Sequence, residues 1–191
     1  MLKIRSLTLL ILSLLVSFAT FCNEPKFKYT TLYDLDGPVK EVKIKSKNPI
    51  VITNAKVKFM KNGARKNSLM SYNNEGYPVG YQFVPYSWIE TVTIEYNDSN
   101  RPSKITQTEY SRDSRNVTEI TFEYDGKRIS EMTVTTPEVK RICRYNGEVR
   151  DNYGNWTSRN VEMEIISLKE SQPYRPITFV ETRDIKYYDL N

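Results

Sequence analysis

Apolar residues recur at every second position in several stretches of the chain. In residues 91–96, 119–124 and 161–165, apolar side chains alternate with threonine and glutamate. A period of two with β-branched and aromatic residues is typical of antiparallel strands that have one face in the core and one in water. The pattern therefore predicts half-buried strands at these three places, with Ile120 and Phe122 facing the core.

The alternation weakens in two other regions. Residues 105–109 carry glutamine and glutamate in the apolar phase, and the phase shifts at Met132 and Val134, so edge strands or β-bulges are expected there. The best helix candidate, residues 62–73, contains Gly63 and lacks an i, i+3, i+4, i+7 stripe, which favours a hairpin or loop. We expect an all-β fold, in which an antiparallel meander forms a twisted sheet curled into a half-open barrel or sandwich.

Turn-forming residues follow a tyrosine at four points in the chain. Tyr72, Tyr96, Tyr124 and Tyr145 are 24, 28 and 21 residues apart, and each precedes an Asn or Asp that starts a polar or Gly-containing cluster. Asn, Asp and Gly tolerate the positive φ values that tight hairpin turns require. The spacing indicates an internal repeat of low fidelity with one hairpin per unit.

These turns resemble the YD-repeat, or RHS-like, family, whose unit is a strand ending in Tyr-Asp, a short turn and a second strand. Residues 124–129 match this unit well, and residues 96–101 match it more loosely. Further segments are similar to small exported proteins of this type from Gram-negative bacteria, namely residues 35–42, 151–159 and 181–188. The resemblance implies a scaffold of YD-type β-hairpins and transfers no activity. The toxin-enclosing shell of large RHS proteins is not implied, because this chain has too few hairpins to close one.

The N-terminus has the pattern of a secretory signal peptide. Lys3 and Arg5 precede an apolar stretch, residues 7–16, and Ser17 and Ala19 occupy the −3 and −1 positions that signal peptidase prefers. The apolar stretch is shorter than the about 20 residues of a transmembrane helix, and no later segment approaches that length.

Cys22 stands where a lipoprotein cysteine would stand, but Phe21 before it is larger than a lipobox allows, which argues against lipid anchoring. We expect residues 1–22 to be a signal peptide and residues 23–191 to form one β-rich YD-repeat-like domain. The mature protein is expected to be periplasmic or extracellular, with no transmembrane segment.

Charge and composition argue against several classes of function. The formal net charge of +5 falls to +3 without Lys3 and Arg5, and this near balance does not predict nucleic-acid binding. The chain has no histidine, which removes the commonest general base, the Ser-His-Asp triad and most zinc sites. No Gly-rich phosphate loop follows a strand. We therefore expect no catalytic residues, no cofactor and no metal.

Carboxylates and cysteines leave some alternatives open. A glycoside hydrolase needs only two carboxylates, which could come from Glu95, Glu109, Glu119 and Glu123. Lysine and arginine are equally frequent on these strands, which favours cross-strand ion pairs. The acidic segments 34–37 and 97–100 lack the ligand spacing of an EF-hand and are predicted to be turns. Cys143 is expected to be a small buried residue unless Cys22 survives processing and pairs with it.

Aromatic residues are the most distinctive feature of the composition, with fourteen tyrosines and two tryptophans. Pro78, Gly80 and Pro85 predict a surface loop between residues 81 and 88. Exposed aromatic rings in such a loop can stack on sugars or anchor a protein partner. The candidate partner-binding residues are Tyr81, Phe83, Tyr86 and Trp88. The alternative is that these rings close the end of the core; Trp156, beside a turn, is predicted to be structural.

Three functions follow in order of preference. The first is a non-enzymatic exported protein that binds a cell-envelope partner or a polysaccharide through its β scaffold. The second is a structural envelope module without a soluble ligand, and the third is a carboxylate-dependent enzyme that acts on glycans. Binding predicts an exposed aromatic patch, a structural role predicts buried aromatics, and an enzyme predicts two carboxylates about 5 to 9 Å apart. The sequence does not indicate an oligomeric state.

Overall fold

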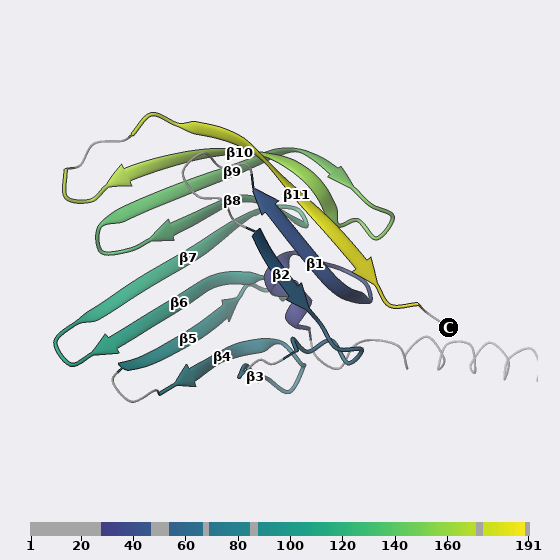
Figure 1. Cartoon of the computed structure of the whole chain (residues 1–191), viewed down its shortest axis with the longest axis horizontal. Helices are drawn as coiled ribbons and strands as arrows, with labels where there is room; N and C mark the ends of the chain where they lie inside the picture. Colours follow the sequence, from purple (N-terminus) through teal and green to yellow (C-terminus); the bar gives the residue numbers. More distant parts are fainter. Residues whose placement is uncertain (1–27, 47–53, 67–68, 85–87, 171–173, 190–191) are drawn as a thin grey trace, which may run out of the picture.

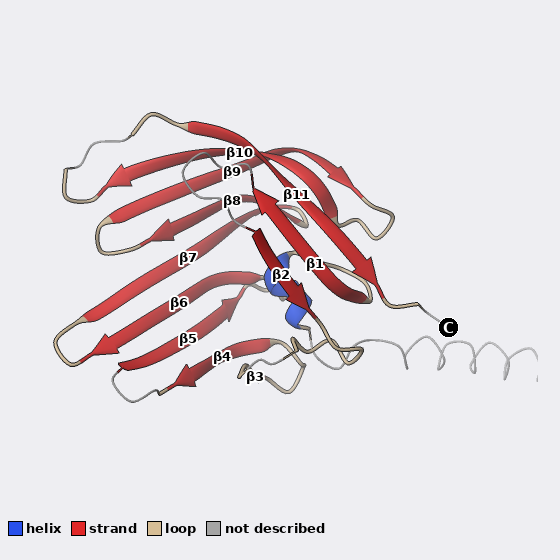
Figure 2. Ribbon diagram, viewed as in Figure 1, coloured by secondary structure: helices blue, strands red, loops and turns tan. Residues whose placement is uncertain are grey.

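The structure is a computed structural model that describes residues 28–46, 54–66, 69–84, 88–170 and 174–189. Within these residues the chain forms one 3-10 helix, η1 (Tyr29–Tyr33), and one sheet of eleven antiparallel strands (Figure 2). The strands before the middle of the chain are β1 (Val39–Ser46), β2 (Asn54–Lys58), β3 (Ser71–Tyr72), β4 (Pro78–Phe83), β5 (Trp88–Tyr96) and β6 (Pro102–Ser111). The remaining strands are β7 (Arg115–Asp125), β8 (Arg128–Thr135), β9 (Val139–Arg150), β10 (Trp156–Ser167) and β11 (Ile177–Tyr187).

The strand order confirms the predicted all-β meander and adds one long-range pairing. Each strand from β3 to β10 pairs with the next strand along the chain, while β11 also pairs with β1, which has β2 on its other side. The sheet curls so that β8–β11 lie over β4–β7, and β1 and β2 pass in front of them (Figure 1). The outermost strands, β2 and β3, are not paired with each other, so the curled sheet remains a half-open barrel.

Alternation along the strands sorts the side chains onto an inner and an outer face. Ile94, Ile105, Ile120 and Val134 pair across β5 to β8 into one row on the inner face. Thr121, one position away, is exposed on the outer face. The predicted direction of the side chains in residues 119–124 is therefore confirmed, although the inward ones are only half-buried.

Of the two regions predicted to be edge strands or bulges, the first prediction was wrong and the second is confirmed. Residues 105–109 lie in β6, an interior strand whose pairing runs without a register shift through residues 104–110. The phase shift at Met132 follows a bulge in β8, because Glu123 pairs with Glu131 whereas Tyr124 pairs with Ile129. Gln107 and Glu109 interrupt the apolar phase because the inner face of β6 is accessible to solvent at that end. Residues 60–66 form a tight turn before β3, which agrees with the hairpin or loop predicted there.

Three turns at one end of the sheet share a conformation built around an Asn or Asp side chain. Asn73, Asn97 and Asp151 each accept hydrogen bonds through Oδ1 from the backbone N–H groups two and four residues later, at 2.9–3.1 Å. The residue three positions on has a positive φ and is Gly76, Asn100 or Gly154, residue types that adopt this region readily. The turns predicted after Tyr72, Tyr96 and Tyr124 are confirmed. The turn predicted after Tyr145 was wrong, because Asn146 and Gly147 lie inside β9, where its register with β10 shifts.

Tyrosines beside these turns fasten neighbouring strands together. The hydroxyl of Tyr96 donates to the carbonyl oxygen of Pro78 at 2.6 Å, and that of Tyr124 donates to the carbonyl oxygen of Pro102 at 2.7 Å. A register shift lies next to each of these tyrosines. Because such bulges increase the local twist of a strand, they help to curl the sheet at this end.

Residues 28–37, here called the plug, fill the turn-bearing end of the half-open barrel. Their apolar side chains pack against β1 and β2 in a buried cluster. Asp34 forms an ion pair with Arg101 of the β5–β6 turn at 3.0 Å. Asn155, before β10, bonds the backbone N–H and C=O of Asp36 at 2.6 and 2.9 Å. The plug thus joins strands from both sides of the curled sheet and leaves the opposite end accessible.

Candidate functional site

The end of the half-open barrel opposite the plug holds an apolar hollow of about 710 Å³, here called the trough. Its apolar lining comes from the inner face of four adjacent strands, and Ser46 of β1 completes the edge. Strands β8 and β9 contribute Met132, Val134, Val139 and Cys143. Strands β10 and β11 contribute Met163, Ile165, Ile177 and Phe179. Its volume lies within the ~300–1,000 Å³ of typical small-molecule sites.

The trough continues a packed core rather than forming a separate dent in the surface. Cys143 and Met163 are buried and form one cluster with Val161, and four further lining residues pack against it: Met132, Ile165, Ile177 and Phe179. Burial raises the pKa of the Cys143 thiol to about 11, so it stays neutral near pH 7. The expected burial of Cys143 is confirmed, whereas Cys22 lies outside the described residues and their pairing stays a prediction.

A group of arginine and aromatic side chains closes the inner end of the trough. Glu181 of β11 is the last lining residue, and its carboxylate accepts two hydrogen bonds from Arg159 of β10, at 2.8 and 3.0 Å. The Arg159 guanidinium carbon lies 3.4 Å from the ring centre of Tyr145 and 3.9 Å from that of Trp156. Arg183 lies 3.6 Å from the indole of Trp156. We call Arg159, Glu181, Arg183, Tyr145 and Trp156 the arginine cluster.

Trp156 is fully buried within this cluster. Among the described residues its indole Nε1 has no hydrogen-bond partner, and the same holds for Arg159 Nη1 and Arg183 Nε. Buried donors are normally satisfied by protein or ligand atoms or by water. The arginine cluster therefore holds three buried N–H groups without a partner among the described residues, directly behind Glu181 at the inner end of the trough.

Arg183 makes no ion pair with a described residue, although the charges of Asp34 and Glu181 act on it from nearby. Glu181 pairs with Arg159 and Asp34 with Arg101, while the one hydrogen bond of the Arg183 side chain goes to the backbone oxygen of Asp34 at 3.3 Å. Burial, and next the charge of Arg159, lower the pKa of Arg183 to about 9. Its positive charge is thus destabilised in the folded chain.

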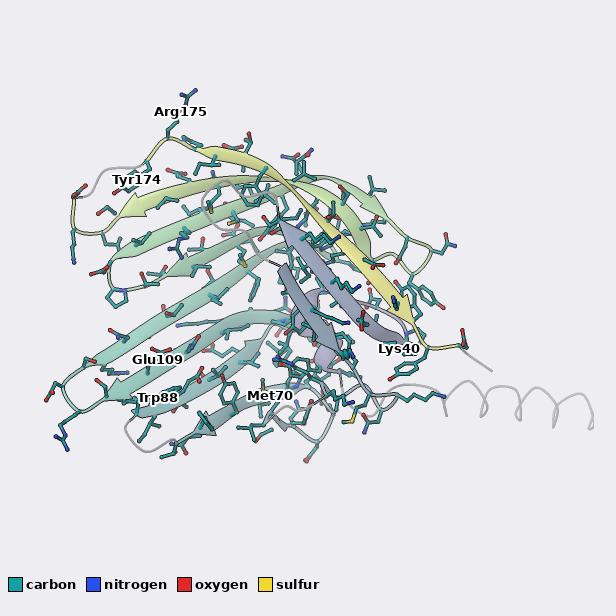
Figure 3. The ribbon with its side chains drawn as sticks, in the orientation of Figure 1. Lys40, Met70, Trp88, Glu109, Tyr174 and Arg175 are labelled. Atoms are coloured by element: carbon teal, nitrogen blue, oxygen red, sulfur yellow. The ribbon has the colours of Figure 1, made fainter. Side chains whose placement is uncertain are left out.

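Two further arginines stand at the mouth of the trough. Arg141 lies on β9 among the apolar lining residues, and Arg175 precedes β11 beside Tyr174 (Figure 3). All three side chains are exposed. Neither arginine makes an ion pair with any other residue that the structure describes. Positive charge therefore marks both ends of the trough.

The prediction of an aromatic surface loop over residues 81–88 was wrong for the described residues. Tyr81 and Phe83 belong to β4, and Trp88 is the first residue of β5. Pro78 is tolerated in β4 because it is the first residue of the strand. Gly80 is required there, since a Cβ atom would lie 2.0 Å from the carbonyl oxygen of Val92. Tyr86 and Pro85 lie outside the described residues.

The structure does bring the other three candidate aromatics together. The rings of Phe83 and Trp88 meet edge to face at 5.8 Å, and their side chains are 41% and 38% exposed. Tyr81 is half-buried next to them. Strand pairing places all three on the inner face at the open end, and Trp88 lies near the lower edge of that end in Figure 3. This group is neither a buried plug nor a projecting loop.

A carboxylate pair lies on the inner face beside these aromatics, and sequence reasoning identified only half of it. Glu90 and Glu109 are paired residues on β5 and β6, and both accept from Gln107 Nε2, at 2.9 and 3.2 Å. Their oxygens therefore lie within about 6 Å of each other. The Tyr81 hydroxyl donates to Glu90 at 2.7 Å. Glu90 occupies the apolar phase of β5, which is the signal that could have found it.

The other three glutamates that we considered face outward. Glu95, Glu119 and Glu123 have the opposite phase to Ile94, Ile120 and Phe122 on their strands. Glu119 forms a cross-strand ion pair with Lys104 at 2.6 Å, as the interspersed charges predict. These three glutamates cannot share a site with the inward carboxylates.

The described residues contain no group of three or more Cys, Asp or Glu side chains placed to hold a metal ion. The segment 97–100 is one of the Asx-type turns, as expected. No described helix is long and apolar enough to cross a membrane. Comparison of the chain with protein-family models, with curated proteins and with solved structures finds no match.

Proposed function

We propose that the protein is a non-enzymatic binding protein that holds the long apolar chain of an amphiphile in the trough. The observation that carries this proposal is the trough itself, about 710 Å³ in volume and lined by apolar side chains from four adjacent strands. Apolar surface of this kind gains free energy when it is removed from water, by about 25 cal/mol per Å². No other described part of the chain covers it.

The side chains that line the trough favour binding of an acyl chain over a sugar or a peptide. The backbone groups of β8 to β11 are used in pairing between these strands. The side chains between Met132 and Phe179 on the wall are mostly apolar, so sugar hydroxyls or peptide amides would enter it without partners, at a cost of about 1–3 kcal/mol each. The arginines at both ends favour an amphiphile with a negative charge.

We further propose that this binding takes place outside the cytoplasm. Residues 1–22 have the composition of a signal peptide, and they lie outside the described residues. The repeated Asn- and Asp-centred turns support kinship with small exported YD-repeat proteins. A periplasmic or extracellular protein has lipids and their acyl chains as abundant neighbours, which fits an envelope partner.

A pair of adjacent substitutions on β11 tests the proposal. Ile177→Lys places a charge in the trough, whereas Thr178→Lys places the same charge on the exposed outer face of the same strand. Binding is followed by the fluorescence of the uncharged probe N-phenyl-1-naphthylamine and by its displacement with 1-hexadecanol. We expect the wild type and Thr178→Lys to bind, and Ile177→Lys to bind at least about ten-fold more weakly because it buries a charge.

Circular dichroism melting shows that both variants are folded. The proposal fails if the wild type gives no fluorescence increase, or if Ile177→Lys binds the probe as tightly as Thr178→Lys.

A second candidate function is glycan binding at Phe83 and Trp88. The specific observation is that two partly exposed rings lie beside Glu90, Glu109 and Gln107, since sugars stack on rings while their hydroxyls bond to carboxylates and amides. On a glycan array, Trp88→Ala should lose the signal. Tyr153→Ala removes an aromatic ring of similar exposure from the turn before β10 and should keep it. An array without wild-type signal rules this candidate out.

A further inference from the structure

The inner face of β11 changes from apolar to charged along its length. Every second residue from Ile177 points inward, and the series continues with Phe179, Glu181 and Arg183. The first three line the trough, and Arg183 lies two residues, or about 7 Å, further toward the plug. An extended chain lying along β11 with one end at the mouth therefore has its other end directed at the arginine cluster.

The arginine cluster has more positive charge than the described residues neutralise. Its neighbourhood holds four guanidinium groups against three carboxylates. Arg101 pairs with Asp34, Arg150 with Glu148 and Arg159 with Glu181, and Arg183 is the fourth. The excess is one positive charge. Burying an unpaired charge is costly, because protein groups replace the lost hydration only partly.

The unused hydrogen-bond donors of the cluster lie around one ring. Arg159 and Arg183 both lie within 4 Å of the Trp156 indole, and each of the three side chains has one buried N–H without a partner among the described residues. Water molecules could accept these hydrogen bonds but would leave the excess charge. A singly charged anion would satisfy both requirements.

We propose that the arginine cluster is the headgroup site of the trough and that it binds the carboxylate of a long-chain fatty acid. This inference rests on the proposed function, since the trough must first accept the chain. The acid enters the half-open barrel with its carboxylate leading, and the carboxylate accepts hydrogen bonds from Arg159 Nη1 and from its neighbours at Trp156. The alkyl chain then fills the space between Met132 and Phe179.

A carboxylate fits the cluster better than a phosphate monoester does. The excess to be neutralised is one charge, and a phosphate monoester carries nearly two at pH 7. Glu181 already accepts two hydrogen bonds from Arg159, and its negative charge lies near the entrance of the cluster. This charge would repel a doubly charged headgroup more strongly than a singly charged one.

The first experiment compares ligands that share one chain and differ in headgroup. Palmitate, 1-hexadecanol and monohexadecyl phosphate compete for N-phenyl-1-naphthylamine on the wild-type protein. We expect palmitate to bind at least about ten-fold more tightly than the alcohol, because charge-assisted hydrogen bonds are roughly twice as strong as neutral ones. Equal binding of palmitate and alcohol would overturn the headgroup site while leaving the proposed function intact. Tighter binding of the phosphate than of palmitate would also overturn it, and no binding at all would overturn the proposed function itself.

The second experiment locates the headgroup with two arginine substitutions. Arg183→Met removes the excess charge without leaving a carboxylate unpaired, because Arg183 makes no ion pair among the described residues. We expect this variant to bind 1-hexadecanol like the wild type and to lose the preference for palmitate. Arg175→Met at the mouth is the matched control and should keep the preference.

The melting temperatures distinguish binding from a structural role. Replacing a poorly paired buried charge by a residue of similar volume is often neutral or stabilising, so Arg183→Met should melt at the wild-type temperature or above. Loss of the preference in Arg175→Met but not in Arg183→Met would place the headgroup at the mouth and overturn the inference. A variant that melts much lower and still prefers palmitate would show that Arg183 has only a structural role.

Discussion

Asn155 is the side chain whose replacement tests most directly how the plug is held. It is buried, and its amide makes three hydrogen bonds: Oδ1 accepts from the backbone N–H of Asp36, and Nδ2 donates to the Asp36 carbonyl and to the Tyr187 hydroxyl, at 2.6, 2.9 and 2.7 Å. At about 1 kcal/mol for each hydrogen bond, Asn155→Ala should lower the free energy of unfolding by about 3 kcal/mol.

Two controls separate the hydrogen bonds from the packing of the turn. Asn155→Asp keeps the shape but turns an oxygen toward the carbonyl of Asp36, so it should destabilise the protein at least as much as Asn155→Ala. Asn152→Ala changes an exposed residue of the same turn, and its effect should lie within about 0.5 kcal/mol. Urea denaturation, followed by tyrosine and tryptophan fluorescence, gives all three values. A loss below about 1 kcal/mol for Asn155→Ala would refute the view that these bonds hold the plug.

Three further outcomes can be checked. Phe122→Ala should lower the free energy of unfolding by about 1–3 kcal/mol in chemical denaturation, which is less than for a fully buried Phe because this ring is half-buried. Thr121→Ala should change the free energy of unfolding by under about 0.5 kcal/mol, and equal effects of the two substitutions would mean that the register is wrong. Burial raises the pKa of the Cys143 thiol to about 11, so its alkylation by iodoacetamide at pH 8 should be roughly 100-fold slower than that of free cysteine, and the alkylation rate should rise with pH. The raised pKa also makes the free energy of unfolding depend on pH: the contribution of this thiol to stability is present below pH 9 and is lost as the pH passes 11. Intact mass of the protein from its native host should show cleavage between Ala19 and Asn23, and a mass that retains Met1 would contradict export.

The strands were predictable from the sequence because their local pattern is strong. In β5, β7 and β10 the alternation of apolar residues with Thr and Glu placed the strands and their faces correctly. The turns after Tyr72 and Tyr96 were predictable for a similar reason, since an Asn side chain and a residue with positive φ act within five residues. Both signals are local, and neither depends on the rest of the fold.

The pairing of β1 with β11 had no local signal. It joins residues about 140 positions apart, and many strands with alternating polarity would match β1 equally well. The plug was equally hidden, because its contacts come from turns that are distant in the chain, such as the one at Arg101 and the one at Asn155. The aromatic segment misled the prediction, since Pro78 and Gly80 are tolerated in β4 by its specific pairing with β5.

The arginine cluster could be predicted from the sequence only in part. In residues 177–187 the inward phase reads Ile, Phe, Glu, Arg, Ile and Tyr, so the alternation alone places Glu181 and Arg183 inside the sheet. At Arg159 the phase is obscured, because the register of β10 shifts between Trp156 and Asn160.

Stability does not explain why the chain keeps these charges inside. Apolar residues of similar size at buried charged positions are often neutral or stabilising, and the rest of the inner wall is built from such residues. Arg183 is the clearest example, because burial lowers its pKa to about 9 and no described carboxylate lies in ion-pair distance. Groups with strongly perturbed pKa values cluster at functional sites, and the unpaired charge of Arg183 favours a ligand that is negative. The position of the arginine cluster at the end of an apolar trough is what a fatty acid, with its single charge and its long chain, would require.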